Sequence, residues 1–273
     1  MNILMMGATG YLGSHIVSVL EKGNVIFGIC HKTSCESKRN MICIPQSDYK
    51  AFLSRHNIDW VINCIGAYQK ESIADMIEAN FSFPSQVIGT ALSYGVENIL
   101  NINTALPEEL NVYSFTKRML GHFGKCCCTW QEVNFYNLLV EMFYGEDEPE
   151  DRFLSTLIGK MKVNQDVLLT DGNQRRDIVH IEDVCQAVSL TINSQLKGYY
   201  DIPVGTGEGH TIREIAQYLH SKLNSSSSLL FGAVPMRKNE PDSIANISLL
   251  EKLGYKVRYP WTNGLNHMCQ QIK

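Results

Sequence analysis

The chain has 273 residues, of which 44% are hydrophobic and 19% are charged, and its formal net charge is −4. Such a length and composition are typical of a globular protein with one large α/β domain, or a main domain and a smaller lobe. The weakly acidic balance gives no reason to expect nucleic acid or a membrane surface as a partner, and no apolar run reaches the roughly 20 residues that span a bilayer. We therefore expect a cytoplasmic protein without a signal peptide.

Nine cysteines are scattered along the chain without a C-x-x-C pair. Cys126, Cys127 and Cys128 are adjacent, so their side chains point in different directions on a helix or a strand and are poorly placed to bind one metal ion. We expect no metal site and no disulfide, and we interpret the cysteines as reduced thiols, several of them buried.

A glycine-rich turn follows the first predicted strand, which covers residues 2–6. Glycine lets the backbone approach a pyrophosphate, and the N-terminus of the following helix offers N–H groups and a positive dipole. Many α/β domains use such turns as plain connections, but the order strand, turn, helix favours a dinucleotide site. Its predicted cofactor-binding residues are Gly7, Thr9, Gly10, Tyr11, Leu12 and Gly13.

Strands and helices alternate through the next part of the chain. The predicted strands cover residues 24–30, 41–44, 59–66, 98–103 and 132–139. The predicted helices between them cover residues 49–55, 73–94 and 112–124. This alternation predicts an α/β fold with a doubly wound parallel sheet, which is a Rossmann domain.

The pattern loosens after Gly145. Thr211 and Glu214 form a capping box that predicts the start of a helix, and further helices are expected at 153–161, 184–192 and 248–253. We assign residues 1–145 and 176–204 to the Rossmann domain, and residues 146–175 and 205–273 to a smaller C-terminal substrate-binding lobe.

Three residues are candidates for acid–base chemistry. Tyr113 and Lys117 lie four residues apart in a predicted helix, so their side chains share one face. A free phenol has a pKa of about 10, and an adjacent ammonium lowers it toward neutrality. Thr104 ends the preceding strand, where its hydroxyl can reach a ligand carbonyl. A Y-x-x-x-K string is common by chance, but its position after the fifth strand favours a catalytic role.

Together these motifs resemble the extended short-chain dehydrogenase/reductases, and within them the NAD-dependent epimerase/dehydratase family that acts on nucleotide sugars. The likeness covers residues 2–264 and includes the string R-R-D-I-V-H-I-E-D at 175–183. The resemblance implies that Tyr113 is the general acid/base, that Lys117 lowers its pKa and holds the nicotinamide ribose, and that Thr104 hydrogen-bonds the substrate oxygen. It also implies cofactor contacts at Gly66, Ala67 and Asn80, with an ordinary turn glycine as the alternative for Gly66 and a plain polar helix residue as the alternative for Asn80.

The stretch after the second strand bears on the choice of cofactor. NAD enzymes usually place an acidic residue there to bind the ribose hydroxyls. Here no acid appears before Glu36, whereas Lys32, with His31 and Ser34, can neutralise a 2′-phosphate. The alternative interpretation is a basic surface loop that does not contact the cofactor. We predict that the cofactor is NADPH rather than NAD, which implies that the enzyme catalyses a net reduction of its substrate.

Arg176 and Arg237 are predicted to bind the substrate pyrophosphate, because a guanidinium stays charged and can make two parallel hydrogen bonds to a phosphate. Enzymes of nucleotide sugars carry arginines in the segments that these two residues resemble. Either arginine can instead be a solvated surface residue.

Two departures from the family pattern narrow the resemblance. Only residues 105–112 separate Thr104 from Tyr113, a shorter loop than in many extended members, and the usual R-x-x-N-x-Y-G string reads L-V-E-M-F-Y-G at 139–145. The roles of the missing arginine and asparagine are therefore not transferred. The short loop and the altered string look most similar to the CDP-abequose and CDP-paratose synthase type, which are reductases of a CDP-linked 4-keto-3,6-dideoxyhexose.

We therefore expect an enzyme of deoxysugar and O-antigen biosynthesis that uses NADPH to reduce the 4-keto group of a nucleotide-diphosphate deoxysugar. A nucleotide-sugar 4-epimerase with retained NAD is the alternative, and a non-catalytic NADP-binding regulatory protein is a third reading. Family members commonly pair through the helix after the fourth strand and the Tyr/Lys helix, so we expect a homodimer. The residues available for that surface, or for the core, are Ile73, Ile77, Phe81, Met119 and Phe123.

Overall fold

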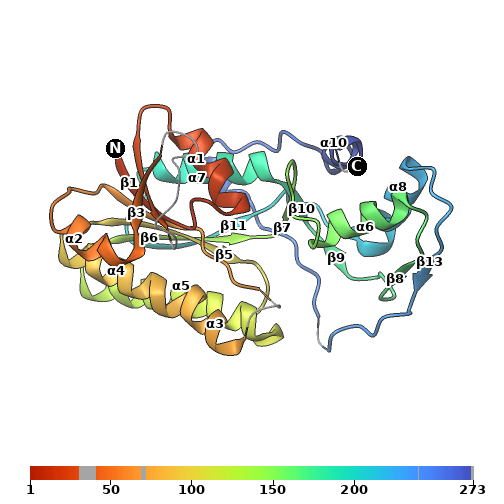
Figure 1. The fold of residues 1–273 in the computed structure, drawn as a ribbon, viewed down its shortest axis with the longest axis horizontal. Helices are drawn as coiled ribbons and strands as arrows, with labels where there is room; N and C mark the ends of the chain where they lie inside the picture. Colours follow the sequence, from red (N-terminus) through yellow and green to blue (C-terminus); the bar gives the residue numbers. More distant parts are fainter. Residues whose placement is uncertain (31–40, 69–71, 239, 272–273) are drawn as a thin grey trace. The chain divides into compact units, whose positions relative to one another are not determined.

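The computed structural model describes residues 1–30, 41–68, 72–238 and 240–271 (Figure 1). The chain forms two compact units, Met1–Val140 with Ala187–Ile202, and Glu141–Gln186 with Pro203–Lys273. The first segment of the first unit thus ends at Val140 and the second covers Ala187–Ile202, whereas the sequence analysis assigned residues 1–145 and 176–204 to the Rossmann domain.

A seven-stranded sheet forms the centre of the first unit, in the order β11-β6-β5-β4-β1-β2-β3. The strands are β1 (Asn2–Met6), β2 (Val25–Cys30), β3 (Met41–Pro45), β4 (Trp60–Asn63), β5 (Asn98–Thr104), β6 (Asn134–Val140) and β11 (Tyr199–Val204). All pairings from β6 to β3 are parallel. The chain moves outward from β1 to β3 and then returns to the other side of β1, which confirms the predicted doubly wound Rossmann fold and creates its switch point.

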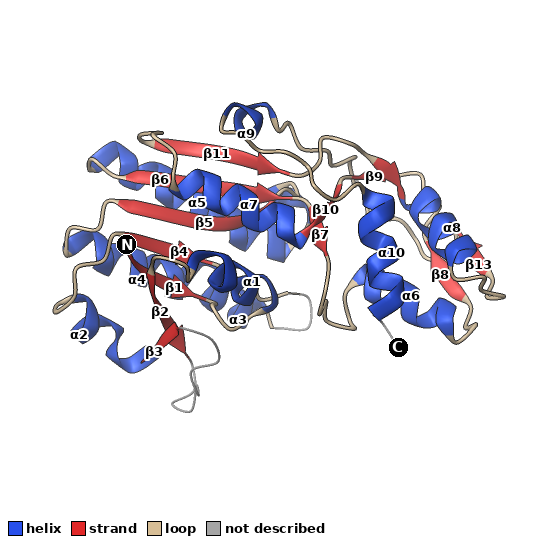
Figure 2. Cartoon of the chain, turned by 90° about the horizontal axis from the view of Figure 1, so that it is seen from above, coloured by secondary structure: helices blue, strands red, loops and turns tan. Residues whose placement is uncertain are grey.

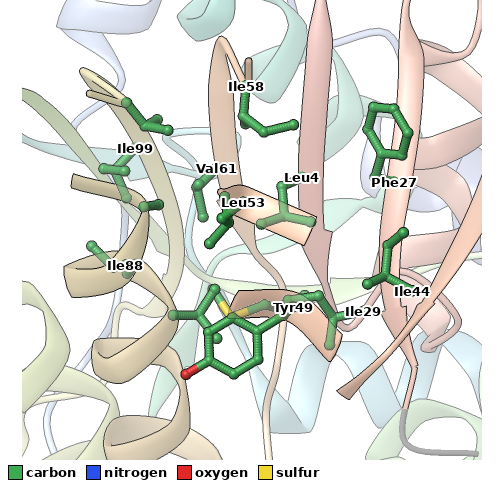
Figure 3. Close-up of a cluster of buried hydrophobic side chains, with 14 of the residues drawn as sticks. Leu4, Phe27, Ile29, Ile44, Tyr49, Leu53, Ile58, Val61, Ile88 and Ile99 are labelled. Carbon is green, nitrogen blue, oxygen red and sulfur yellow. The ribbon is translucent and has the colours of Figure 1, made fainter. Parts of the chain in front are cut away.

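Helices cover both faces of this sheet (Figure 2). They are α1 (Tyr11–Leu20), α2 (Tyr49–Leu53), α3 (Ile73–Ile77), α4 (Phe83–Ser93), α5 (Val112–Trp130) and α7 (Ile181–Ile192). α1 lies on one face, and α2, α4 and α5 lie on the other (Figures 1 and 2). Figure 3 shows the core under the second group, where Leu4, Phe27 and Val61 from the strands meet Tyr49 and Ile88 from the helices.

The helix predicted over residues 73–94 is present as a helical run from Ile73 to Ser93, but its middle is not α-helical. A π-helical turn, Glu78–Ser82, separates α3 from α4, and it contains the fully buried Asn80. A π-helical turn inserts an extra residue into the helix and is frequent at functional sites.

The predicted end of the Tyr/Lys helix at Gly124 is wrong, because α5 continues to Trp130. Gly124 is there for close packing: a Cβ atom at this position would collide with the ring of the buried Phe135 in β6. Gly121 serves the same purpose one turn earlier, where a Cβ atom would lie 2.7 Å from Nδ2 of Asn137. The two glycines let α5 approach the sheet closely.

Among its described residues, the second unit contains short paired strands and four helices of its own. The strands are β7 (Met142–Tyr144) with β10 (Ile178–His180), β9 (Arg175–Arg176) with β12 (His210–Thr211), and β8 (Val167–Leu169) with β13 (Leu229–Phe231). The helices are α6 (Phe153–Lys162), α8 (Ile212–Lys222), α9 (Ser248–Lys252) and α10 (Trp261–Gln271). The capping box predicted at Thr211 and Glu214 is confirmed at the start of α8. Among the described residues, no helix has the length and apolar character needed to cross a bilayer.

Gly124→Ala should destabilise the protein by about 1–2 kcal/mol, because the added methyl group displaces the Phe135 ring in a close-packed core. Gly89→Ala in α4 is the matched control, since a Cβ atom there meets nothing within 4 Å. The control should stabilise the protein by roughly 0.5–1 kcal/mol through helix propensity. Urea denaturation measures both changes, and equal effects of the two substitutions would contradict the packing role of Gly124.

Candidate active site

The glycine turn between β1 and α1 is shaped for a phosphate group. Gly7 has a φ of +74°, and a Cβ atom on it would lie 2.8 Å from the carbonyl carbon of Cys64. A Cβ atom on Gly13 would collide with the Gly7 carbonyl oxygen. Gly10 caps α1 and contributes no side chain to the helix N-terminus. The turn thus brings the N–H groups of α1 to a surface that only glycine can leave open, which fits a dinucleotide pyrophosphate.

Lys117 is 3% exposed and lies on α5. Its Nζ donates a hydrogen bond to the carbonyl oxygen of Ile65, 2.7 Å away, in the loop that follows β4. The Ile65 N–H donates in turn to Oδ1 of Asn63 at 3.2 Å. Since Gly7 packs against the main chain of Cys64, the glycine turn and the Lys117 ammonium meet at the two neighbouring residues Cys64 and Ile65.

Burial shifts the pKa values of Lys117 and Cys64. It lowers the pKa of Lys117 from its ordinary value to about 8. It also raises the pKa of the Cys64 thiol to about 12, against the opposing effect of the Lys117 charge. At neutral pH the lysine is therefore mainly an ammonium, and Cys64 is a neutral thiol beside it.

Asn80 holds the loop after β4 in place. Its Nδ2 donates to the Ala67 carbonyl oxygen and to Oγ1 of Thr116, both at 3.0 Å, while its Oδ1 accepts from the Ala67 N–H at 2.8 Å. Both of its N–H donors are therefore used within the protein. In this structure Asn80 positions the main chain of Ala67. A direct contact between Asn80 and a cofactor stays a prediction.

Tyr113 lies in the first turn of α5 and is half-buried. A capping box between Asn111 and Ser114 fixes this turn. The Tyr113 ring packs edge-to-face on Tyr68 of the β4 loop, with 4.6 Å between the ring centroids. Tyr113, Lys117 and the loop that begins at Cys64 thus form one contiguous site.

Thr104 ends β5 and is 7% exposed. Its Oγ1 accepts a hydrogen bond from the Leu106 N–H at 3.2 Å. Arg118 of α5 donates to the carbonyl oxygens of Ala105 and Leu106, at 3.2 Å each. The short loop after Thr104 is thus tied to the helix that carries Tyr113 and Lys117.

A row of buried asparagines behind the site was missed by the sequence analysis. Asn63 donates to Asn101, Asn101 to Asn137, and Asn137 to the Asp201 carboxylate, at 2.9, 2.9 and 2.6 Å. These side chains cross β4, β5, β6 and β11 and end at Ile65 through Asn63. The available signal was an amide inside each of three apolar strands, where an unpaired amide would be costly.

The two arginines predicted to bind the substrate lie in the second unit. Arg176 is 4% exposed, and its guanidinium pairs with Glu240 and donates to the Pro241 and Arg175 carbonyl oxygens at 2.7 and 2.8 Å. Arg237 is exposed. The predicted 2′-phosphate residues His31, Lys32 and Ser34 lie outside the described residues. Within the part of the chain that is described, no cluster of three His, Cys, Asp or Glu side chains suits a metal ion.

Residues 3–204 match the NAD dependent epimerase/dehydratase family, and the chain belongs to this family. Among curated relatives, it is 27% identical to the CDP-abequose synthase of Salmonella muenchen, over 97% of this chain and 96% of the relative. It is 25% identical to the CDP-abequose synthase of Salmonella typhimurium, over 99% and 98%. It is 22% identical to a putative UDP-glucose 4-epimerase of Methanocaldococcus jannaschii, over 99% and 98%.

Solved structures show the same fold. The UDP-glucuronic acid 4-epimerase of Bacillus cereus, in complex with UDP-glucuronic acid and NAD, superposes with a TM-score of 0.87 at 21% identity, covering 100% of this chain and 99% of that one. The UDP-glucose 4-epimerase of Thermus thermophilus, in complex with NAD, gives a TM-score of 0.84 at 19% identity, with the same coverage.

Lys117→Met should give a folded protein that is more stable than the wild type at pH 7 by about 1–2 kcal/mol. Keeping this buried ammonium charged costs the folded state roughly 3 kcal/mol, and the lost hydrogen bond offsets part of the gain. Between about pH 8 and the ordinary value of 10.5, the unfolded chain holds more protons on this group than the folded chain does. Wild-type stability therefore rises with pH in that window, and the advantage of the variant shrinks.

Urea denaturation at pH 7 and pH 9.5 measures this difference. Lys125→Met, which changes an exposed lysine of the same helix, is the control: it keeps Lys117, so its stability relative to the wild type should be the same at both pH values. A Lys117→Met variant that is less stable than the wild type by the same amount at both pH values would contradict the buried ammonium.

Proposed function

We propose that this protein is an NADPH-dependent ketoreductase that reduces the 4-keto group of a nucleotide-diphosphate deoxysugar, with a CDP-linked 4-keto-3,6-dideoxyhexose as the first candidate. The observation that carries the proposal is the contact of the Lys117 ammonium with Ile65, beside the glycine turn, on the helix that bears Tyr113. The full-length similarity to two CDP-abequose synthases supports the substrate class.

The cofactor would be held by the glycine turn. The backbone of Gly7, Gly10 and Gly13 and the N-terminus of α1 suit the pyrophosphate, and the Ala67 backbone positioned by Asn80 lines the adjoining loop. The basic residues after β2, Lys32 foremost, are the proposed partners of a 2′-phosphate. When bound, NADPH supplies a hydride to the carbonyl carbon of the sugar ketone.

The side chains of the protein supply the proton and stabilise the negative charge that develops during the reduction. Tyr113 donates its phenolic proton to the ketone oxygen, and the Lys117 ammonium stabilises the phenolate that remains. An ammonium has three donors, so the bond to Ile65 leaves two for the ribose and for Tyr113. Thr104 Oγ1 accepts from Leu106, so the Thr104 hydroxyl proton can be donated to the same substrate oxygen.

Arg176 and Arg237 are the proposed partners of the substrate pyrophosphate. Arg176 already carries the carboxylate of Glu240, so binding of a phosphate requires that Glu240 share or release the guanidinium. Arg237 is exposed, so a phosphate can approach it from solvent. We also propose a homodimer through α3 and α5, since Ile73 and Ile77 are 59% and 41% exposed.

A 4-epimerase with retained NAD is the second candidate, favoured by the 22% identity to the putative UDP-glucose 4-epimerase over almost its whole length. Incubation with NADPH and a panel of CDP-, dTDP-, GDP- and UDP-linked 4-keto sugars separates the two. We expect cofactor oxidation with at least the CDP-linked substrate. Purified protein that retains NAD, interconverts UDP-sugars and leaves added NADPH unconsumed would overturn the ketoreductase.

Tyr113→Phe should reduce kcat by roughly 10²–10⁴-fold, because it removes the proton donor while keeping the ring. NADPH affinity, measured by fluorescence titration, should stay within about twofold because the Lys117 anchor is untouched. Tyr68→Phe is the matched control: it keeps the ring that packs on Tyr113, and its activity should remain close to that of the wild type. A Tyr113→Phe variant with wild-type turnover would exclude Tyr113 as the acid.

A further inference from the structure

Two cysteines of the first unit lie in direct contact at the edge of the sheet. The sulfur atoms of Cys30, the last residue of β2, and Cys43, in β3, are 3.0 Å apart. In the register of these parallel strands Cys43 lies opposite Gly28 and Cys30 lies opposite Pro45, so the two thiols meet diagonally on one face. No disulfide joins them in this structure. We refer to Cys30 and Cys43 as the thiol pair.

Gly28 lies opposite Cys43 in this register and marks the face of β2 that carries the thiol pair. Gly28 has no side chain, and a Cβ atom there would collide with the Met41 sulfur and lie 3.3 Å from the Cβ of Ala8. Ala8 belongs to the glycine turn. The thiol pair therefore lies on the same face of β2 as the proposed cofactor cradle, opposite the face whose Phe27 and Ile29 enter the hydrophobic cluster of Figure 3.

The two thiols differ in access to solvent. Cys30 is 4% exposed, whereas Cys43 is partly exposed. An oxidant from solution therefore reaches Cys43 first, and Cys30 is placed to react with the product. A disulfide has a sulfur–sulfur distance of about 2.05 Å, so closing the 3.0 Å gap draws the two sulfur atoms, and with them the strands that carry them, about 1 Å closer.

We propose that the thiol pair is a reversible redox switch on cofactor binding. A hydroperoxide such as hydrogen peroxide oxidises the Cys43 thiol to a sulfenic acid and is itself reduced to water. The Cys30 thiol then attacks the sulfenic sulfur, the disulfide bond forms, and a second water molecule leaves with the proton. Two thiols and one hydrogen peroxide thus give one disulfide and two waters, and an external dithiol restores the reduced pair by exchange.

The bond would act on the end of β2 that the adenosine ribose requires. In this fold the carboxyl end of the second strand carries the residue that binds that ribose, and Cys30 directly precedes the stretch that begins at His31. Drawing Cys30 toward Cys43 moves the end of β2 relative to Ala8 in the glycine turn. The oxidised protein therefore binds NADPH more weakly. This consequence rests on the proposed cofactor, whereas formation of the disulfide does not.

Peptide mapping tests the bond directly. Trypsin cleaves after Lys32 and Lys38, so Cys30, Cys35 and Cys43 fall on three different peptides. After mild peroxide treatment, alkylation and digestion without reductant, we expect mass spectrometry to detect the Cys30 and Cys43 peptides joined with the loss of two hydrogens. Dithiothreitol should separate them. Two alkylated peptides after treatment, or a link from either cysteine to Cys35, would overturn the proposal.

NADPH titration tests the consequence. We expect oxidation to raise the Kd by about tenfold, within the range of typical coupling between sites, and dithiothreitol to restore it. Cys43→Ser should lose this response, with Cys43→Ala as a second variant if serine impairs folding, and Cys35→Ser should keep it. A mapped bond with an unchanged Kd would overturn the switch. A reduced protein that binds no NADPH would instead contradict the proposed function, and the peptide map would still decide whether the bond forms.

Discussion

The hydrogen bond from the buried Lys117 ammonium to the Ile65 carbonyl is the interaction on which the candidate active site depends. An ammonium is costly to bury, and the lowered pKa of Lys117 records that cost. The bond joins α5 to the loop after β4, and the same loop packs against Gly7 of the cofactor turn. A helix, a loop and a turn from distant parts of the sequence therefore meet around one cation.

Close packing behind the site makes this reach possible. Gly121 and Gly124 let α5 pack closely on β5 and β6. The Lys117 side chain can then extend to Ile65, just beyond the carboxyl end of β4. The buried amides under the helix form a continuous row that ends at Asn63, which binds the Ile65 N–H. Since nearly every buried amide must find a partner, this row constrains the helix and the loop together.

The alternation of apolar strands and helices was sufficient to predict the Rossmann fold, and the spacing of Gly7, Gly10 and Gly13 located its turn. The tyrosine and lysine were visible because their helical spacing follows from sequence alone. Other features arise only in three dimensions. The position of Asn80 depends on a π-helical turn. Arg176 pairs with Glu240, which lies 64 residues further along the chain. The contact between Cys30 and Cys43 follows from the register of two strands. Strands of two or three residues carry no periodic pattern, which explains why those of the second unit were missed.

Direct titration of Lys117 tests the central claim best. In protein labelled with ¹³C at the lysine ε-carbon, NMR follows the protonation of each side chain with pH. We predict that the Lys117 signal titrates near pH 8 in the protein without cofactor. A titration near 10.5, the ordinary value for a lysine in water, would mean that the ammonium is solvated and does not join α5 to the cofactor turn.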